Sequence, residues 1–284
     1  TTFLGGNSNA RTNVEKLINI STRSQVDASS ELIAGFVITG AAAKPVLVRA
    51  VGPALRAFEV SDALAAARVQ IFQNGAVLAT GENWSASPDA AAIAATAERV
   101  GAFALTAGSR DAALLLTLQP GSYTAVVTGV DGATGVALIE VYDATQGVIP
   151  RDQRMINIST RAVAGTGDTT LIAGFVVDGL VPKKVLVRGV GPALAQFNVG
   201  GTIAQPRVGV YSGASLLRDN TGWSASADAS AIADASAAVG AFAFLANSRD
   251  AALIINLAPG AYTAQVSDAA GGSGNALLEV YELP

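Results

Sequence analysis

The chain has 284 residues, of which half are hydrophobic and only 14% are charged, and it contains neither histidine nor cysteine. The missing side chains exclude Ser-His-Asp and Cys-His catalysis, thiol redox chemistry, disulfides, and metal sites built on His or Cys. A net charge of −4 without a basic cluster argues against nucleic-acid binding, which needs a positive surface.

The apolar residues are spread along the whole chain. Mean hydropathy is +0.42, yet no stretch reaches the roughly 18 consecutive apolar residues of a membrane-spanning helix. Ordinary domains carry about 25% charged residues, so this chain has more apolar surface than usual. Such a surplus is typical of a protein that buries part of its surface against a partner.

Residues 1–16 precede the rest of the pattern and are interpreted as an N-terminal arm. Its tip is apolar and is followed by two glycines. A terminus is usually disordered unless other parts of the protein hold it. An ordered arm would either pack on its own domain or insert as an extra strand into a neighbouring copy. The second possibility predicts assembly contacts through Thr1, Thr2, Phe3, Leu4, Gly5 and Gly6.

Strands are predicted next along the chain. Runs of β-branched and aromatic residues bounded by Gly, Pro and Asn are typical of strands. In the first half they cover residues 46–50, 68–72, 114–118, 123–127 and 136–142. Asn74-Gly75 lies between two apolar runs, which predicts a hairpin with a two-residue turn.

A helix interrupts these strands. Ser87-Pro88-Asp89 supplies an N-cap residue, a proline at the first helical position and an acid in the first turn. An alanine-rich segment follows as far as Arg99, and Gly101 ends it. The sequence therefore predicts one short helix between strands, and again from Ser226 to about Ala238.

The second half of the chain repeats the first. Trp84-Ser-Ala-Ser returns at Trp223, an offset of 139 residues, whereas the motif starting at Asn19 returns at Asn157 with an offset of 138. A period of this length corresponds to a whole domain. We therefore expect two homologous domains, 17–148 and 149–284, after the arm 1–16.

The spacing of the elements predicts the fold class. Short strands separated by turns, with one inserted helix, are typical of antiparallel β-sandwiches, including jelly rolls. We expect a mainly β protein with two tandem homologous antiparallel β-sandwich domains of jelly-roll-like form. Each domain carries one short inserted helix.

Charged residues lie inside apolar strands. An unpaired buried charge costs several kcal/mol, so these residues are predicted to form structural ion pairs between strands. They are Arg49, Asp111 and Glu140, with Arg188, Asp250 and Glu279 in the second copy. A carboxylate-arginine functional site is the alternative, but the occurrence in both copies favours a structural role.

Two tryptophans precede the predicted helices. Trp84 and Trp223 could form platforms for stacking on sugars, or they could anchor the helix to the sheet, and we favour anchoring. Scattered acids such as Asp131 and Asp143 could offer oxygens to Ca²⁺, but the chain has no dense acidic loop. No metal and no cofactor are predicted.

The repeated motifs resemble a known family. Asn19-Ile-Ser-Thr-Arg, Leu32-Ile-Ala-Gly-Phe-Val, Val46-Leu-Val-Arg-Ala-Val-Gly-Pro-Ala-Leu and Glu140-Val-Tyr resemble a repeat module of large secreted and surface proteins of environmental bacteria. The second half of each copy, with Pro120-Gly-Ser-Tyr, is more loosely similar to bacterial pre-peptidase C-terminal domains. Either resemblance implies an extracellular, non-catalytic β-sandwich.

Three hypotheses on function follow. We expect a non-catalytic structural subunit of an extracellular filament or cell-surface assembly, joined head to tail with copies of itself. The alternative is a carbohydrate- or protein-binding accessory module of a larger secreted protein. A carboxylate-based enzyme such as a glycosidase needs two carboxyl groups about 5–10 Å apart in a cleft, and nothing in the sequence favours it.

Overall fold

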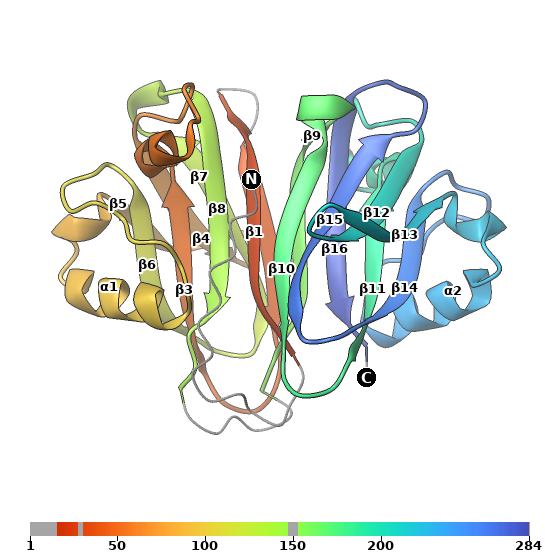
Figure 1. The fold of residues 1–284 in the computed structure, drawn as a ribbon, viewed down its shortest axis with the longest axis horizontal. Coiled ribbons are helices and arrows are strands. Elements are labelled where there is room, and N and C mark those ends of the chain that lie inside the picture. The colour runs from red at the N-terminus through yellow and green to blue at the C-terminus, as the bar shows by residue number, and fades with distance from the viewer. Residues whose placement is uncertain (1–15, 28–30, 147–152, 284) are drawn as a thin grey trace. The chain divides into compact units, whose positions relative to one another are not determined.

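The computed structural model describes residues 16–27, 31–146 and 153–283 (Figure 1). The described part forms two compact units, one over Ile18–Met155 and one from Ile156 onward, with Lys16 and Leu17 grouped with the second.

The first unit contains eight strands. They are β1 (Lys16–Val26), β2 (Leu32–Ile38), β3 (Lys44–Val51), β4 (Ala67–Gln73), β5 (Ala76–Glu82), β6 (Ala112–Leu118), β7 (Gly121–Gly129) and β8 (Gly135–Asp143). The helix α1 (Ala90–Arg99) lies between β5 and β6 in the chain, and short 3-10 turns follow β3, β5 and β7.

These strands form two antiparallel sheets. Their orders are β1-β8-β3-β6 and β2-β7-β4-β5. Each sheet takes strands from both ends of the unit, which is the topology of a jelly roll. The predicted mainly β sandwich of jelly-roll-like form is therefore confirmed.

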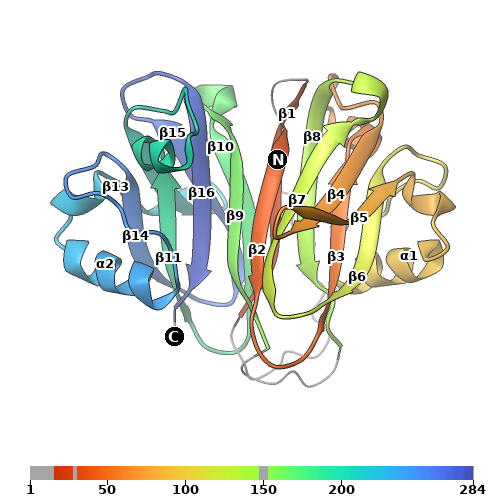
Figure 2. The ribbon, with the colours of Figure 1, turned by 180° about the vertical axis from the view of Figure 1, so that it is seen from behind.

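The second unit has the same architecture (Figure 2). Its strands are β9 (Met155–Ala164), β10 (Leu171–Asp178), β11 (Lys183–Val190), β12 (Pro206–Ser212), β13 (Ser215–Thr221), β14 (Ala251–Leu257), β15 (Gly260–Asp268) and β16 (Gly274–Glu282). The sheets run β9-β16-β11-β14 and β10-β15-β12-β13, and α2 (Ala229–Ala238) lies between β13 and β14 in the chain.

Burial along the strands follows from the sandwich. β2 alternates between buried and half-buried residues, as expected for a strand with one face toward the core. In β3, seven of the eight residues are buried, because α1 covers the sheet face that would otherwise meet solvent. Beneath α1, Leu47 packs with Ile93, Ala113 and Tyr142.

The hairpin turn agrees with the sequence, whereas the start of the helix does not. Asn74 and Gly75 have φ values of 52° and 79°, and two consecutive positive φ values are what a tight hairpin turn needs. α1 begins at Ala90 with Asp89 as its N-cap residue and no side-chain cap hydrogen bond, so the prediction of Ser87 as N-cap is wrong. The Ser87 hydroxyl instead accepts the Asp89 N–H at 3.1 Å in the turn ahead of the helix. Gly101, with φ of 75°, follows the helix.

Both helices are short. α1 and α2 have ten residues each. Among the residues that the structure describes, none of the helices has the length and apolar character needed to cross a bilayer.

Candidate functional site

An ion pair lies buried under α1 in the first unit. Arg49 on β3 and Glu140 on β8 are direct cross-strand partners, and the Arg49 Nε lies 3.1 Å from Glu140 Oε2. Arg49 is 0% exposed and Glu140 is 3% exposed. The Arg49 Nη1 donates to the Phe103 carbonyl at 2.8 Å, and the Tyr142 hydroxyl donates to Glu140 Oε1 at 2.7 Å. The pair therefore sits in a network that joins two strands and the segment after α1.

The second unit repeats this pair. Arg188 Nε lies 3.2 Å from Glu279 Oε2, and the Tyr281 hydroxyl donates to Glu279 Oε1 at 2.8 Å. Burial raises the pKa of Glu279, and the charge of Arg188 offsets this only in part. Burial and the adjacent Glu279 carboxylate also raise the pKa of Tyr281. The network is thus held in a poorly solvated environment, where removal of one partner is costly.

The two aspartates do not play the role predicted for them. Asp111 was expected in the ion pairs, but its Oδ1 accepts the backbone N–H groups of Gly52 and Ala54 at 2.8 and 3.3 Å. Asp250 does the same for Gly191 and Ala193. Each carboxylate therefore caps a 3-10 turn that follows β3 or β11, where the first N–H groups lack backbone acceptors.

A further buried pair was missed by the sequence analysis. Lys44 Nζ lies 2.9 Å from Asp143 Oδ2, with side-chain exposures of 0% and 1%. Lys44 also donates to the Thr145 hydroxyl at 3.0 Å. Lys183 lies 3.9 Å from Glu282 at the corresponding place in the second unit. Both lysines begin a strand, and their burial was not predicted from the sequence.

The tryptophans pack between helix and sheet. Trp84 is 8% exposed and joins the cluster that contains Ile93 of α1 and Leu47 of β3. Its indole Nε1 donates to the Thr106 carbonyl at 3.2 Å. Trp223 is half-buried and packs with Ile232 of α2. Both therefore lie where the predicted helix-to-sheet anchors belong.

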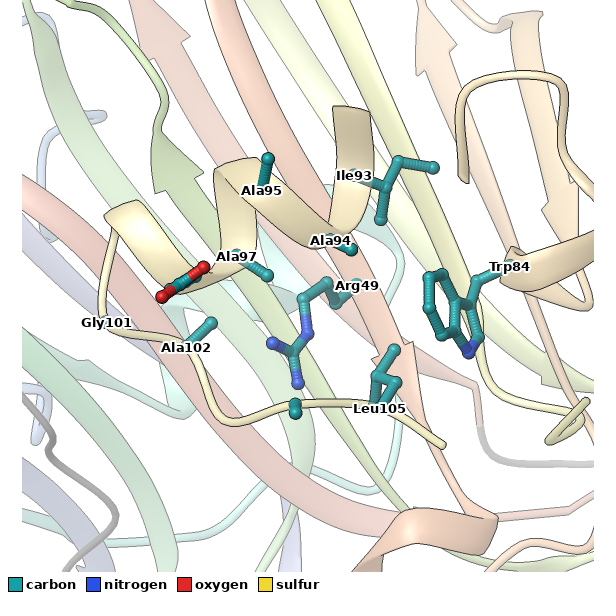
Figure 3. A pocket seen from close by; sticks show the side chains of 11 residues that line it. Arg49, Trp84, Ile93, Ala94, Ala95, Ala97, Gly101, Ala102 and Leu105 are labelled. Carbon is teal, nitrogen blue, oxygen red and sulfur yellow. The ribbon is translucent and has the colours of Figure 1, made fainter. Parts of the chain in front are cut away.

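A pocket of about 870 Å³ opens between α1 and the segment 101–105 (Figure 3). Apolar side chains form most of its wall, including Trp84, Ile93, Ala97 and Leu105, and Glu98 adds a carboxylate. Figure 3 shows the Arg49 guanidinium between the helix and the 101–105 segment. A concave apolar site with a few polar groups is the usual form of a small-molecule site.

The corresponding pocket of the second unit has a volume of only about 110 Å³. The repeat offset places Phe244 where the first unit has Leu105. The ring centroids of Phe244 and Trp223 are 5.7 Å apart. The Arg188 Cζ lies 4.0 Å from the centroid of the Phe244 ring. The larger side chain thus fills space that stays open in the first unit.

A second candidate surface lies on the strands that end one sheet of each unit. β5 pairs with β4 and β13 pairs with β12, and within the described part of each unit no strand pairs with the other side of β5 or β13. Val77 and Leu78 on β5 are each 52% exposed, and Leu216 and Leu217 on β13 are 44% and 45% exposed. Unpaired strand edges with apolar side chains favour pairing with another chain.

Several sequence predictions have no structural counterpart here. The proposed arm contacts of Thr1, Thr2, Phe3, Leu4, Gly5 and Gly6 lie outside the described residues, as does the domain boundary at 147–150. Among the described residues, no group of three or more acidic side chains could hold a metal ion. Asp143 instead binds Lys44, and Asp131 lies at the surface, 4.0 Å from Arg110.

Comparison with protein-family models and with curated proteins finds no match. Among solved structures, the chain is similar to tandem CBM51 modules of a family 98 glycoside hydrolase from Streptococcus pneumoniae. The identity is 7%, with a TM-score of 0.25 over 92% of this chain and 83% of that chain. Oxalate decarboxylase from Bacillus subtilis matches at 9% identity and a TM-score of 0.15, over 98% of this chain and 79% of that chain. These similarities are too distant to bear on function.

Proposed function

We propose that the protein is a non-catalytic structural subunit that associates with copies of itself at a cell surface or in an extracellular filament. The observation that carries the proposal is the pair of apolar edges. Val77 and Leu78 correspond to Leu216 and Leu217 at the repeat offset of 139, and all four side chains are exposed. A lone exposed apolar residue needs no explanation, but a matched pair on an edge strand in both units does.

The proposed contact joins two different edges. β5 of one copy pairs with β13 of the next, which hides four apolar side chains and satisfies main-chain N–H and C=O groups on both strands. Because the two surfaces differ, the contact is heterologous and repeats from one copy to the next. Such a contact generates a filament when the rotation between subunits does not close a ring.

The low charge of the chain supports the same proposal. β5 carries one charged residue, Glu82, and it is already paired with Arg68. Natural edge strands are commonly protected from pairing by lysine, proline or inward charges, and β5 has none of these devices. The resemblance of the repeated motifs to modules of secreted bacterial proteins supports an extracellular location.

The binding-module alternative stays open in a restricted form. A carbohydrate platform would need exposed aromatic faces, whereas Trp84 is 8% exposed and Trp223 packs with Phe244. A protein-binding module would use the same apolar edges as the filament. Because self-association and binding of a foreign partner would use the same surface, an experiment is needed to distinguish them.

The test replaces the apolar edge residues with lysine. The variants Val77→Lys/Leu78→Lys and Leu216→Lys/Leu217→Lys should each reduce association, because a buried unpaired lysine is costly. Sedimentation velocity and electron microscopy of the purified chain measure the outcome. The control is Leu180→Lys, at a site that is 56% exposed but lies outside the strands, and it should associate normally.

Two results would overturn the proposal. One is a wild-type chain that stays monomeric at all concentrations tested, which removes self-association altogether. The other is a filament that both lysine variants still form at the wild-type concentration, which removes the edge contact. Loss of association in only one of the two variants would contradict the pairing of β5 with β13.

A further inference from the structure

The two units share one framework around the buried arginine but differ in residues that line the pocket beside it, including Glu98 against Ala237. Arg49, Trp84 and Phe103 in the first unit correspond to Arg188, Trp223 and Phe242 in the second. Leu105 corresponds to Phe244. The second unit therefore shows what the pocket of the first unit looks like when an aromatic ring fills it.

In the second unit, two aromatic rings cover the guanidinium. The Arg188 Cζ lies 4.4 Å from the centroid of Phe242 and 4.0 Å from that of Phe244. The Phe244 ring also contacts Phe242 edge-on at 6.0 Å and Trp223 at 5.7 Å. Cation–π contacts of this kind are favourable and stronger where water is excluded. Phe244 thus completes an aromatic cage that leaves only about 110 Å³ open.

In the first unit, one wall of this cage is an aliphatic side chain. Arg49 Cζ lies 4.5 Å from the centroid of Phe103, and Leu105 stands at the position of the second ring. The pocket beside it measures about 870 Å³. Among the described residues, the Arg49 Nη2 is a buried nitrogen with no hydrogen-bond partner, as are Nη1 and Nη2 of Arg188 in the second unit; in the first unit the open pocket leaves room for an acceptor.

We propose that the pocket of the first unit binds a small neutral aromatic molecule that bears an oxygen acceptor. Its ring takes the place that the Phe244 ring occupies in the second unit. This inference goes beyond the proposed self-association and does not depend on it, because the pocket residues and the edge residues are different.

Shape and contacts define how the ring enters. Ala94, Ala95 and Ala97 line the helix side of the pocket (Figure 3), so no long side chain from these positions blocks it. Arg49 is fully buried and Leu105 is half-buried. A ring in this pocket would contact Trp84, Ala97 and Leu105, and Arg49 borders the same space.

Charge defines the class of ligand. Glu140 already neutralises Arg49 at 3.1 Å, and Glu98 adds a negative charge to the wall. A carboxylate ligand would meet this excess of negative charge, so a neutral molecule is favoured. The Arg49 Nη2–H can donate to a hydroxyl or carbonyl oxygen on the ring, which would satisfy a buried donor.

The test uses 2-naphthol as the probe, with decahydro-2-naphthol as its saturated counterpart. Methyl resonances of Ile93 and Leu105 report on the first pocket, and those of Ile232 report on the second. In the wild type, 2-naphthol should shift the first set only, with one site per chain. It should bind roughly five- to thirty-fold more tightly than decahydro-2-naphthol, the ratio expected of one cation–π contact to a buried guanidinium.

A pair of exchanged variants provides the decisive comparison. Leu105→Phe should fill the first pocket and weaken 2-naphthol binding at least ten-fold. Phe244→Leu should open the second pocket, so that the Ile232 methyl also shifts and the stoichiometry rises from one to two. Leu180→Phe adds an aromatic ring at an exposed site far along the chain from both pockets, and it should leave binding unchanged.

The variants also define failure. Unchanged binding in Leu105→Phe, or equal affinity for the saturated and aromatic probes, would overturn the proposal. If Leu105→Phe does not fold, Phe244→Leu decides alone, and a stoichiometry that stays at one would refute the role of this position. Absence of any shift of Ile93 and Leu105 in the wild type, up to the solubility limit of 2-naphthol, would also refute it.

Discussion

Replacement of Glu140 by Gln in the first unit isolates the energetic role of the buried ion pair. Gln keeps the shape of the side chain and can still accept the Tyr142 hydroxyl, which lies 2.7 Å from Glu140 Oε1. It removes the negative charge that faces Arg49 at 3.1 Å. Because Arg49 is 0% exposed, water cannot replace the lost partner.

The size of the effect follows from the geometry. Two unit charges at 3.1 Å attract each other by about 5 kcal/mol at an effective dielectric constant of 20. The cost of burying both charges is of the same order, so the pair as a whole adds little net stability. Removal of one partner leaves the other charge buried without compensation, and we expect Glu140→Gln to lower the unfolding free energy by roughly 3–5 kcal/mol.

A triple variant separates the pair from its burial cost. Arg49→Met/Glu140→Leu/Tyr142→Phe replaces both charges and the attached hydroxyl with apolar groups of similar size. No charge is then left uncompensated, and the unfolding free energy should lie within about 2 kcal/mol of the wild type. A triple variant with a higher unfolding free energy than Glu140→Gln would show that the three side chains act as one coupled buried network.

The assay has to report on the first unit alone. Trp84 and Trp223 are the two tryptophans of the chain, one in each unit. In a Trp223→Phe background, fluorescence during urea unfolding follows the surroundings of Trp84 and therefore the first unit. A loss below about 1 kcal/mol for Glu140→Gln, the range of an exposed pair, would refute the reasoning. So would a triple variant as unstable as the single one.

Three further predictions concern stability. Asp111→Ala removes the acceptor of the Gly52 and Ala54 N–H groups and should cost about 1–3 kcal/mol in urea unfolding, while Asp62→Ala, at an exposed site, should be neutral. Gly135→Ala should cost at least about 2 kcal/mol, because Gly135 has φ of 149° and its Cβ would lie 2.6 Å from the Asp62 carbonyl oxygen, whereas Gly200→Ala meets nothing within 4 Å. The pKa of Glu279 is raised above its usual value of 4.5 in the folded chain, so the folded state binds the carboxyl proton more tightly than the unfolded state does. The unfolding free energy should therefore fall as the pH rises above 4.5. This pH dependence should be missing in Glu279→Gln.

The fold could be predicted from the sequence because the signals that define it are local or repeated. The turn at Asn74-Gly75 is set by backbone preferences of the residues themselves, and the alanine-rich run that follows predicts the helix, although its start was placed too early. The repeat then supplies each element twice, which reduces the chance of a false assignment. Sheet order could not be derived in this way, because the pairing of β1 with β8 joins residues more than 100 positions apart.

The strands before residue 46 were not predicted. β1 contains Asn19, Ser21, Thr22, Arg23 and Ser24, so its composition resembles a loop more than a strand. It is nevertheless a strand because its backbone pairs with β8 over eight residues. Tertiary pairing of this kind overrides local preference, and a single sequence does not show it.

The site was predicted in part. The burial of Arg49 and Glu140 follows from their positions inside apolar strands, since a charge there needs a partner. Asp111 was grouped with them because it too begins an apolar strand, but its neighbours in space are the N–H groups of a turn 57–59 residues earlier. Sequence patterns identify a buried carboxylate, but only the fold decides whether an arginine or a backbone turn satisfies it.

The pocket was missed for a different reason, which also bears on how the two units differ in role. Its walls are alanines and leucines, and such residues carry no chemical motif. The signal lay in the comparison of the two copies, where Leu105 of the first corresponds to Phe244 of the second.

Both units keep the ion pair, the aspartate cap and the tryptophan, as expected of parts that the fold requires. Differences among the residues that line the pocket, with Leu105 against Phe244 beside the arginine, accompany a change in open volume from about 870 Å³ to about 110 Å³, while that framework is kept. In a duplicated chain, positions of this kind are where one copy can acquire a binding role while the other remains a structural element.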